Sequence, residues 1–193
     1  MSDSLGHIAE LWRYPVKSMR GEALQSLAVD QHGVIGDRYF ALKDGTGRLG
    51  SGKTTRRFRQ IEGLLDFTAV TENGAVIIRF PDGRAMRADD PALNAVLTAA
   101  CGIEISVESE DQDKIMHRDS APLHLLTEAS IVWLRERLPN VAIDARRFRP
   151  NIVIAGVAAT GLHEQEWLGR TIAIGDTLIV KAKEATVRCV MTT

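Results

Sequence analysis

Residues 67–80 read Phe-Thr-Ala-Val-Thr-Glu-Asn-Gly-Ala-Val-Ile-Ile-Arg-Phe, and they carry the clearest local signal in the chain. Two apolar runs flank Asn73-Gly74, the kind of pair that suits the positive φ angles of a type I′ turn. The stretch therefore predicts a β-hairpin, with strands over Phe67–Thr71 and Val76–Phe80.

Short strands are predicted on both sides of this hairpin as well. Each is a run of apolar, aromatic or alternating residues that ends at a turn signal. The predicted strands are Ile8–Tyr14, Leu24–Val29, Tyr39–Leu42, Ile103–Val107, Asn151–Ala155, Thr171–Ile174, Leu178–Lys183 and the final segment Ala185–Thr193.

Two segments predict helices. Asp90-Pro91 is a favourable helix start, and Gly102 is a favourable stop for the apolar residues at helical spacing between them. Thr127 predicts the cap of a second helix that ends at Pro139-Asn140, and the buried side of that helix is expected to carry Ala129, Val132, Trp133 and Leu134. Many short strands with two helices predict an α+β protein that is mainly β, with a barrel-like sheet.

The length and composition indicate a soluble globular protein. The chain has 193 residues, of which 45% are apolar and 25% charged, so it can form one large domain or two small interlocked ones. The charged stretch Glu108–Lys114 is the predicted boundary between an N-terminal β subdomain over residues 1–110 and a second domain over residues 111–193, although a solvated loop explains it equally well. A formal net charge of -1 gives no overall attraction to nucleic acid or membrane, so neither is expected as a partner.

The two cysteines, Cys101 and Cys189, make neither a disulfide framework nor a C-x-x-C metal pair. No apolar run is long enough for a signal peptide or a membrane span. We therefore expect a protein of a reducing compartment, the cytoplasm. Cys101 closes the first predicted helix, where a packing role is expected.

Residues 47–54, Gly-Arg-Leu-Gly-Ser-Gly-Lys-Thr, satisfy the P-loop pattern G-x-x-x-x-G-K-[S/T] in full. A P-loop needs a helix directly after the motif, because the helix N-terminus helps to hold the phosphates. Here three arginines follow at once, which is the unfavourable charge for a helix N-terminus, and Gly63 interrupts the segment. A glycine-rich hairpin tip with a basic flank is the preferred interpretation, and a P-loop nucleotide hydrolase is the alternative.

The last segment places a thiol, Cys189, beside the guanidinium of Arg188. A fixed cation favours the thiolate, which is the form that attacks electrophiles and binds metals. Taken alone, the segment is explained equally by a small buried cysteine on a strand. Three histidines, His117, His124 and His163, show no spacing typical of metal ligands, so a solvated or structural role is expected for each.

Six segments together resemble the MOSC family, named for the C-terminal domain of molybdenum-cofactor sulfurase. The resemblance is closest to its two-part members, which include the mitochondrial amidoxime-reducing components and their bacterial relatives. The segments are Tyr14-Pro15-Val16-Lys17-Ser18, Asp37-Arg38, Asp119-Ser120-Ala121-Pro122, Thr127-Glu128-Ala129-Ser130, Phe148-Arg149-Pro150-Asn151-Ile152-Val153 and Arg188-Cys189.

The resemblance implies a β-rich barrel-like fold, with an N-terminal subdomain packed against the MOSC domain. It also implies a site for the molybdenum cofactor, in which Cys189 is the catalytic residue and the metal ligand. The residues that would hold the cofactor are Lys17, Ser18, Arg38, Ser120, Arg149, Asn151 and Arg188. Pyridoxal phosphate belongs to other members of the wider group and is not expected here.

Two functions of different classes follow from the resemblance. The first is an oxidoreductase that reduces N-hydroxylated small molecules with electrons from a separate donor protein. The second is a carrier, either of sulfur as a persulfide on Cys189 or of the cofactor itself. Bound molybdenum that depends on Cys189 would favour the first, and labile sulfane sulfur on metal-free protein would favour the second.

Overall fold

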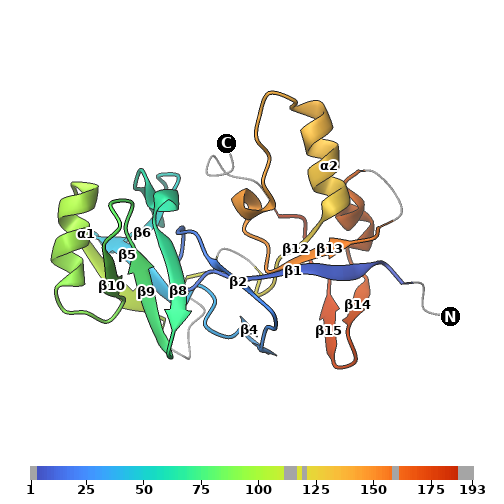
Figure 1. The fold of residues 1–193 in the computed structure, drawn as a ribbon, viewed down its shortest axis with the longest axis horizontal. Helices are drawn as coiled ribbons and strands as arrows, with labels where there is room; N and C mark the ends of the chain where they lie inside the picture. The colour runs from blue at the N-terminus through green and yellow to red at the C-terminus, as the bar shows by residue number, and fades with distance from the viewer. Residues whose placement is uncertain (1–3, 111–116, 119–120, 158–160, 187–193) are drawn as a thin grey trace. The chain divides into compact units, whose positions relative to one another are not determined.

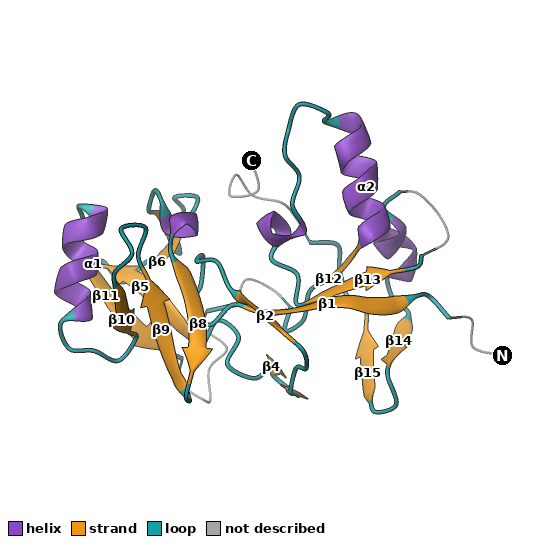
Figure 2. Ribbon diagram, in the orientation of Figure 1, coloured by secondary structure: helices purple, strands orange, loops and turns teal. Residues whose placement is uncertain are grey.

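The computed structural model describes residues 4–110, 117–118, 121–157 and 161–186. These residues form fifteen β-strands, two α-helices and three short 3-10 helices (Figure 1). Strands predominate over helices (Figure 2), so the predicted mainly β, α+β class is confirmed. Neither α-helix in the described part of the chain has the length and apolar character that a membrane span requires.

The chain forms two compact units, and neither is continuous in sequence. Among the described residues, the hairpin unit consists of 13–23, 35–110 and 117–118. The β13 unit consists of the described residues 4–12, 24–34, 121–157 and 161–186. The predicted domains, residues 1–110 and 111–193, are continuous stretches of sequence, whereas these units are defined by contacts in space. The predicted domain division therefore stays a prediction.

The hairpin unit contains two sheets and one α-helix. The first sheet has the order β10-β9-β8, and the second has the order β11-β5-β6-β7. Its elements are β5 (Phe40–Asp44), β6 (Leu49–Ser51), β7 (Phe58–Gln60), η1 (Leu64–Asp66), β8 (Thr68–Glu72), β9 (Ala75–Arg79), β10 (Ala85–Arg87), α1 (Leu93–Cys101) and β11 (Ile105–Ser109).

The predicted hairpin is confirmed as β8 and β9, with Glu72 opposite Ala75. Its turn residues Asn73 and Gly74 have φ angles of 50° and 79°, the positive pair that a type I′ turn requires. One apolar core joins this hairpin to helix α1, and its fully buried members include Val16, Met19, Ala69, Ile78, Leu93 and Leu97. Cys101 packs against that core, in agreement with the predicted packing role.

The β13 unit is organised around β13 (Ile152–Ala155), whose four residues are all buried. It pairs antiparallel with β1 (His7–Arg13) and parallel with β12 (Leu125–Thr127). The sheet order is β12-β13-β1-β2, where β2 spans Glu22–Leu24. The other elements of the unit are β3 (Val29–Asp30), β4 (Gly33–Val34), α2 (Glu128–Arg137), η2 (Ala145–Phe148), η3 (His163–Trp167), β14 (Thr171–Ile174) and β15 (Leu178–Lys181). Trp167 is buried in the core beside Ile152 and Ile154.

Three local predictions were wrong. The predicted strand Leu24–Val29 is strand only at its two ends, because residues 25–28 form no ladder. Helix α1 starts at Leu93 with Ala92 as its N-cap, although the carboxylate of Asp90 still accepts the N–H of Ala92 at 2.8 Å.

The third error concerns helix α2, whose start was predicted correctly. The hydroxyl of Thr127 accepts the N–H of Ser130 at 3.1 Å, which is an N-cap. Its buried face carries Ser130 and Ile131, whereas Val132 is 42% exposed. The face was misassigned because a polar serine is not an obvious core residue.

Candidate functional site

Two segments that carry predicted site residues lie side by side in the hairpin unit. The backbone N–H of Arg38 donates to the carbonyl of Tyr14 at 2.7 Å, and the N–H of Phe40 donates to the carbonyl of Pro15 at 3.0 Å. The N–H of Lys17 then donates to the carbonyl of Phe40 at 2.8 Å. This parallel pairing brings Lys17, Ser18 and Arg38 into one region although about twenty residues separate the segments.

Asp37 fixes the geometry of this region. It is 1% exposed, and its carboxylate accepts the N–H of Tyr14 at 2.8 Å and pairs with the guanidinium of Arg38. The same guanidinium lies over the Tyr14 ring, 4.8 Å from its centroid. Asp37 therefore orients Arg38. Sequence reasoning quoted Asp37 in a motif but assigned it no role; an acid directly before a site arginine was the available signal.

Lys17 and Ser18 are both buried, with 6% and 5% exposure. The hydroxyl of Ser18 donates to the carbonyl of Gly50 in β6 at 3.0 Å, which ties this turn to the glycine-rich strand. The Nζ atom of Lys17 lies 5.2 Å from the centroid of the Phe58 ring. The hairpin unit therefore holds an amine, a hydroxyl and a guanidinium on two paired segments.

Residues 47–54 do not form a P-loop. Gly47, with φ 81°, lies in the antiparallel turn between β5 and β6, so the predicted glycine-rich hairpin tip is present there. After Ser51 the chain makes bends, not a helix, and then enters β7, which pairs parallel with β6. The helix N-terminus that would help to bind nucleotide phosphates is absent from this described stretch, which argues against the hydrolase alternative.

The predicted residues of the β13 unit lie at the start of β13. Asp144 caps the 3-10 helix η2: its carboxylate accepts the N–H of Arg146 at 2.8 Å, and the hydrogen bond from the Arg146 side chain lowers its pKa. Arg149 ends that helix. Asn151 follows, 1% exposed.

The Asn151 side chain joins two neighbouring segments of the β13 unit. Its carbonyl oxygen accepts the N–H of His124 at 3.2 Å, and its amide nitrogen donates to the carbonyl of Trp12 at 3.3 Å. The Nδ1 atom of His124 lies 3.3 Å from the carbonyl oxygen of Arg149. Asn151 and His124 therefore position the backbone that carries Arg149; a structural role was among those expected for His124, but none was expected for Asn151.

Backbone conformation singles out the predicted residues independently of their side chains. Among the described residues, four that are not glycine have positive φ: Ser18 (65°), Arg38 (54°), Asn73 (50°) and Arg149 (53°). Asn73 belongs to the hairpin turn, where this conformation is expected. The other three are predicted cofactor-binding residues. Strained residues of this kind concentrate at ligand and active sites, where surrounding structure holds them in place.

The side chains of His117 and His163 both contact other groups of the protein. His117 is 1% exposed, and its Nδ1 lies 3.1 Å from the carbonyl of Arg38 and 3.2 Å from that of Tyr39. Burial lowers the pKa of His117, partly offset by those carbonyls. His163 pairs with Glu166 at 3.2 Å. Within the described ranges no three His, Cys, Asp or Glu side chains are grouped as metal ligands would be.

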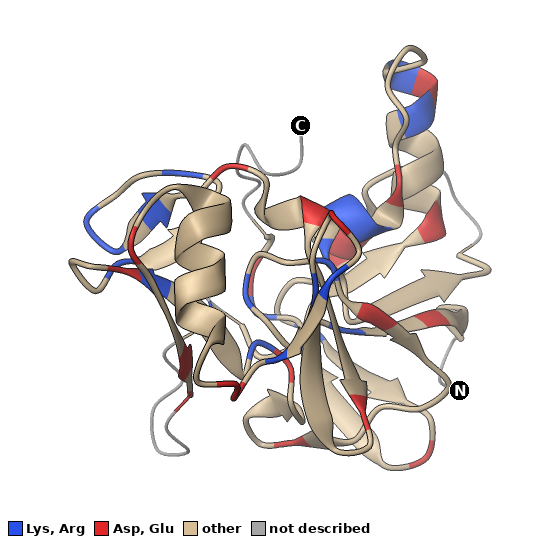
Figure 3. Ribbon diagram, turned by 60° about the vertical axis from the view of Figure 1, so that its left-hand side comes forward, with Lys and Arg blue, Asp and Glu red and all other residues tan. Residues whose placement is uncertain are grey.

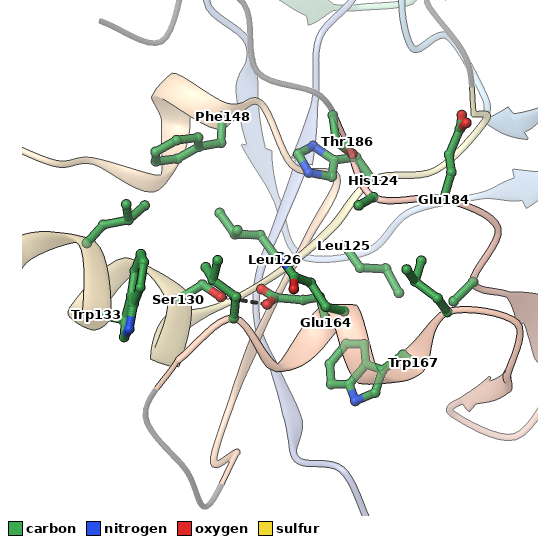
Figure 4. A pocket seen from close by; sticks show the side chains of 16 residues that line it. His124, Leu125, Leu126, Ser130, Trp133, Phe148, Glu164, Trp167, Glu184 and Thr186 are labelled. Carbon is green, nitrogen blue, oxygen red and sulfur yellow. Dashed lines mark hydrogen bonds between the residues drawn. The ribbon is translucent and has the colours of Figure 1, made fainter.

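A cavity of about 360 Å³ opens in the β13 unit beside His124 (Figure 4). Its walls are mostly apolar and include three aromatic rings, those of Trp133, Phe148 and Trp167. The polar groups that line it include His124, Ser130 and Glu164, and the chain from Glu184 to Thr186 forms part of its wall.

Glu164 is the acidic group of this cavity that sequence reasoning missed. Its carboxylate accepts the hydroxyl of Ser130 at 2.5 Å and the backbone N–H of Thr127 at 2.6 Å. It therefore lies at the N-terminus of α2, where the helix dipole favours a negative charge. No local pattern in the sequence links residue 164 to residue 130.

Ser120, Arg188 and Cys189 lie outside the described residues, so their roles stay predictions. Lys17, Ser18 and Arg38 belong to the hairpin unit, and Arg149 and Asn151 belong to the β13 unit. Each unit brings its own residues together. A single site shared by both groups stays a prediction.

Comparison with known protein families identifies the family of this chain. The MOSC N-terminal beta barrel domain matches residues 5–129, and the MOSC domain matches residues 112–193. The chain belongs to the MOSC family. The family resemblance predicted from six short segments is therefore confirmed.

Several relatives of this MOSC chain are amidoxime-reducing components. It is 24% identical to mitochondrial amidoxime-reducing component 1 of Homo sapiens and 23% identical to that of Mus musculus, over 98% of its own length and 66% of theirs. It is 26% identical to mitochondrial amidoxime reducing component 2 of Homo sapiens, over 98% of its length and 67% of that protein. The chain thus spans about two thirds of the length of these curated relatives.

Proposed function

We propose that this MOSC protein binds the molybdenum cofactor and reduces N-hydroxylated small molecules, using electrons from a separate donor protein. The proposal assigns Cys189 as the protein ligand to molybdenum and Lys17, Ser18, Arg38, Ser120, Arg149, Asn151 and Arg188 as residues that hold the cofactor. The relatives named as amidoxime-reducing components support the reaction class.

The observation that carries the proposal is the strained backbone at Ser18, Arg38 and Arg149. These are three of the predicted cofactor residues, from three separate segments, and positive φ at non-glycine residues is uncommon. The donor types also fit the cofactor, because guanidinium and ammonium groups bind phosphate, and amide or hydroxyl groups bind a pterin edge.

When bound, the cofactor supplies the two-electron redox chemistry, and the protein supplies binding and orientation. In this chain Asp37 holds the Arg38 guanidinium in one orientation. Lys17 adds a second cation in a setting that is almost closed to water, where electrostatic interactions are stronger than at an open surface. Asn151 and His124 hold the backbone from which Arg149 projects.

We assign the cavity of the β13 unit to the substrate. Its size and its aromatic walls suit a small planar molecule. The Glu164 carboxylate offers an acceptor to an N–H or O–H group on such a molecule. Thr186, three residues before Cys189 in sequence, lines this cavity.

The test compares wild-type protein, Cys189→Ala and the matched control Cys101→Ala, all produced in a host that makes the cofactor. We expect about one molybdenum and one pterin per chain in the wild type and the control. Both are expected to reduce benzamidoxime with a reduced viologen dye as electron source. Cys189→Ala should lose the activity and most of the metal.

Two outcomes would contradict the reductase. A wild-type protein without molybdenum that carries sulfane sulfur on Cys189 would favour the carrier function. If Cys189→Ala has the same molybdenum content and the same activity as the wild type, Cys189 is not part of the site.

A further inference from the structure

One buried imidazole in the hairpin unit contacts the backbone of the predicted site. His117 is 1% exposed, and its Nδ1 atom lies 3.1 Å from the carbonyl oxygen of Arg38 and 3.2 Å from that of Tyr39. The backbone N–H of His117 donates to the carboxylate of Glu110 at 3.3 Å. His117 and Arg38 are 79 residues apart in sequence, so the tertiary structure alone brings this ring to Arg38.

The two carbonyl contacts fix which ring nitrogen of His117 carries the proton. A carbonyl oxygen can only accept a hydrogen bond, so a ring nitrogen that faces two of them has to be the donor. The Nδ1–H of His117 is therefore shared between the carbonyls of Arg38 and Tyr39. The side chain thus aims a donor at the backbone, which a role in apolar packing does not require.

The surroundings of His117 favour its neutral form. Burial lowers its pKa below the ordinary value of 6.5, and the carbonyl of Arg38, the carboxylate of Glu110 and the carbonyl of Tyr39 offset this only in part. Acids are red and bases blue in Figure 3; those that act on this ring are Glu110, which raises its pKa, and Lys43, which lowers it. The ring is therefore neutral at neutral pH, with Nδ1–H as its donor.

The backbone that His117 contacts is strained. Arg38 has a φ angle of 54°, a conformation that persists only where the surrounding structure holds it. Its N–H donates to the carbonyl of Tyr14 at 2.7 Å, and its carbonyl lies within hydrogen-bond distance of His117. The carbonyl of Tyr39 also accepts the N–H of Glu110 at 2.6 Å. The peptide groups on both sides of Arg38 are therefore fixed.

Arg118, the next residue, extends the contact by one position. Its guanidinium donates to the carbonyl of Asp37 at 3.4 Å. His117 and Arg118 thus contact the carbonyls of three consecutive residues, 37 to 39. Because the Asp37 carboxylate pairs with the guanidinium of Arg38, the main chain and the side chain of Arg38 have separate supports.

We propose that His117 is a positioning residue for Arg38: its Nδ1–H holds the carbonyls of Arg38 and Tyr39 and thereby keeps the Arg38 guanidinium in place for an anionic ligand. The identity of that ligand as the molybdenum cofactor rests on the proposed function. Asp37 acts on the guanidinium, whereas His117 acts on the main chain from which it projects. His117 acts through Arg38 and is assigned no contact with the ligand.

The first experiment separates a hydrogen-bond donor from a packing group with two substitutions. In His117→Asn the amide nitrogen can take the place of Nδ1 and donate, although the side chain is smaller. In His117→Leu the volume is largely kept and the donor is lost. The matched control is His32→Leu, at an exposed histidine of the β13 unit. Circular dichroism checks that each variant is folded.

The readout of the first experiment is the pterin that loaded protein retains after gel filtration. We expect the wild type, His32→Leu and His117→Asn to agree within about twofold, and His117→Leu to retain about threefold less or lower still. A packing role predicts the reverse order, because leucine fills the site better than asparagine does. That reverse order, an equal loss in both His117 variants, or equal retention by all four proteins would overturn the positioning role.

The second experiment uses cofactor-free protein and so does not depend on the proposed function. A positive φ brings the amide hydrogen close to the Hα atom of its own residue, which gives a strong nuclear Overhauser effect. We expect this effect at Arg38 in the wild type and in His117→Asn, and one that is roughly threefold weaker in folded His117→Leu. Nitrogen–proton spectra of the wild-type imidazole should show a neutral ring with its proton on Nδ1 at neutral pH.

A proton on Nε2 of neutral His117, or an unchanged Overhauser effect at Arg38 in folded His117→Leu, would overturn the proposal. The proton position is measured on wild-type protein, so it still decides the matter if His117→Leu does not fold. If the wild type takes up no cofactor at all, the proposed function fails. In that case the Nδ1 proton and the weaker effect in His117→Leu would still establish His117 as the support of the Arg38 backbone.

Discussion

The two units hold different groups of predicted site residues, and they position them in different ways. In the hairpin unit, Lys17, Ser18 and Arg38 are set by pairing between two strand-like segments, with Lys17 and Ser18 buried and Arg38 half-buried. In the β13 unit, the positioning groups support a largely apolar cavity with aromatic walls. Under the proposed function, residues of both units hold the cofactor, and the cavity of the β13 unit receives the substrate.

Among the predicted substitutions, Asp37→Ala is expected to have the largest effect, because Asp37 orients Arg38 in the hairpin unit. Asp37→Ala leaves the Tyr14 N–H and the Arg38 guanidinium without this carboxylate. We expect the free energy of unfolding to fall by about 3 kcal/mol, as for other buried ion pairs that lose one partner. Urea denaturation and molybdenum content measure the two consequences.

Glu72→Gln is the control for Asp37→Ala, because it removes an exposed ion pair of the same unit. It should stay close to the wild type in both measurements. A loss of less than about 1 kcal/mol in Asp37→Ala, with full cofactor content, would contradict the orienting role.

Asp44, at the end of β5 and directly before the turn to β6, provides the next test of the hairpin unit. Burial alone would raise the pKa of Asp44, but hydrogen bonds from Thr46 and Arg48 lower it to about 2 from 3.8. Asp44→Ala should therefore cost about 2 kcal/mol of stability at neutral pH.

The pH dependence of that effect has a definite sign. Because the folded state lowers the pKa of Asp44, its contribution is complete above about pH 4 and is lost as the pH falls toward 2. The stabilities of the wild type and Asp44→Ala should converge over that range. A difference that stays constant down to pH 2 would contradict this account.

The assignment of the β13-unit cavity to the substrate is tested at Trp133, which lines the cavity. Trp133→Leu should raise the KM for benzamidoxime about tenfold, since it removes a large aromatic contact, and should leave molybdenum content unchanged. Val132→Ala, one residue earlier and 42% exposed, should change neither quantity. A loss of molybdenum in Trp133→Leu with an unchanged KM would contradict the assignment of this cavity to the substrate.

The smallest expected effect separates backbone strain from charge at Arg149. Arg149→Gly and Arg149→Ala both remove the guanidinium, but only alanine keeps a strained positive φ. We expect the glycine variant to be more stable by about 1 kcal/mol and both to lose cofactor equally. Equal stability would mean that the backbone at residue 149 relaxes when the side chain is removed.

Local chemistry made several features predictable from the sequence. The Asn73-Gly74 turn, the Thr127 cap and the Gly102 helix stop each depend on residues within a few positions, and all three are present. The six family segments were readable for the same reason, since each is short and continuous. The predicted burial of Val132 was wrong because the buried face of α2 depends on which distant elements pack against it.

By itself, the sequence determined the mainly β class, the positions of the turns and the residue types a cofactor site needs, because these follow from local propensity and spacing. The tertiary structure alone decided that residues 14–18 pair with 37–40, that Lys17 and Lys53 meet at one ring, and that Glu164 bonds to Ser130. Such long-range contacts arise when backbone groups and apolar surface far apart in the chain are satisfied together, and no local pattern records that outcome.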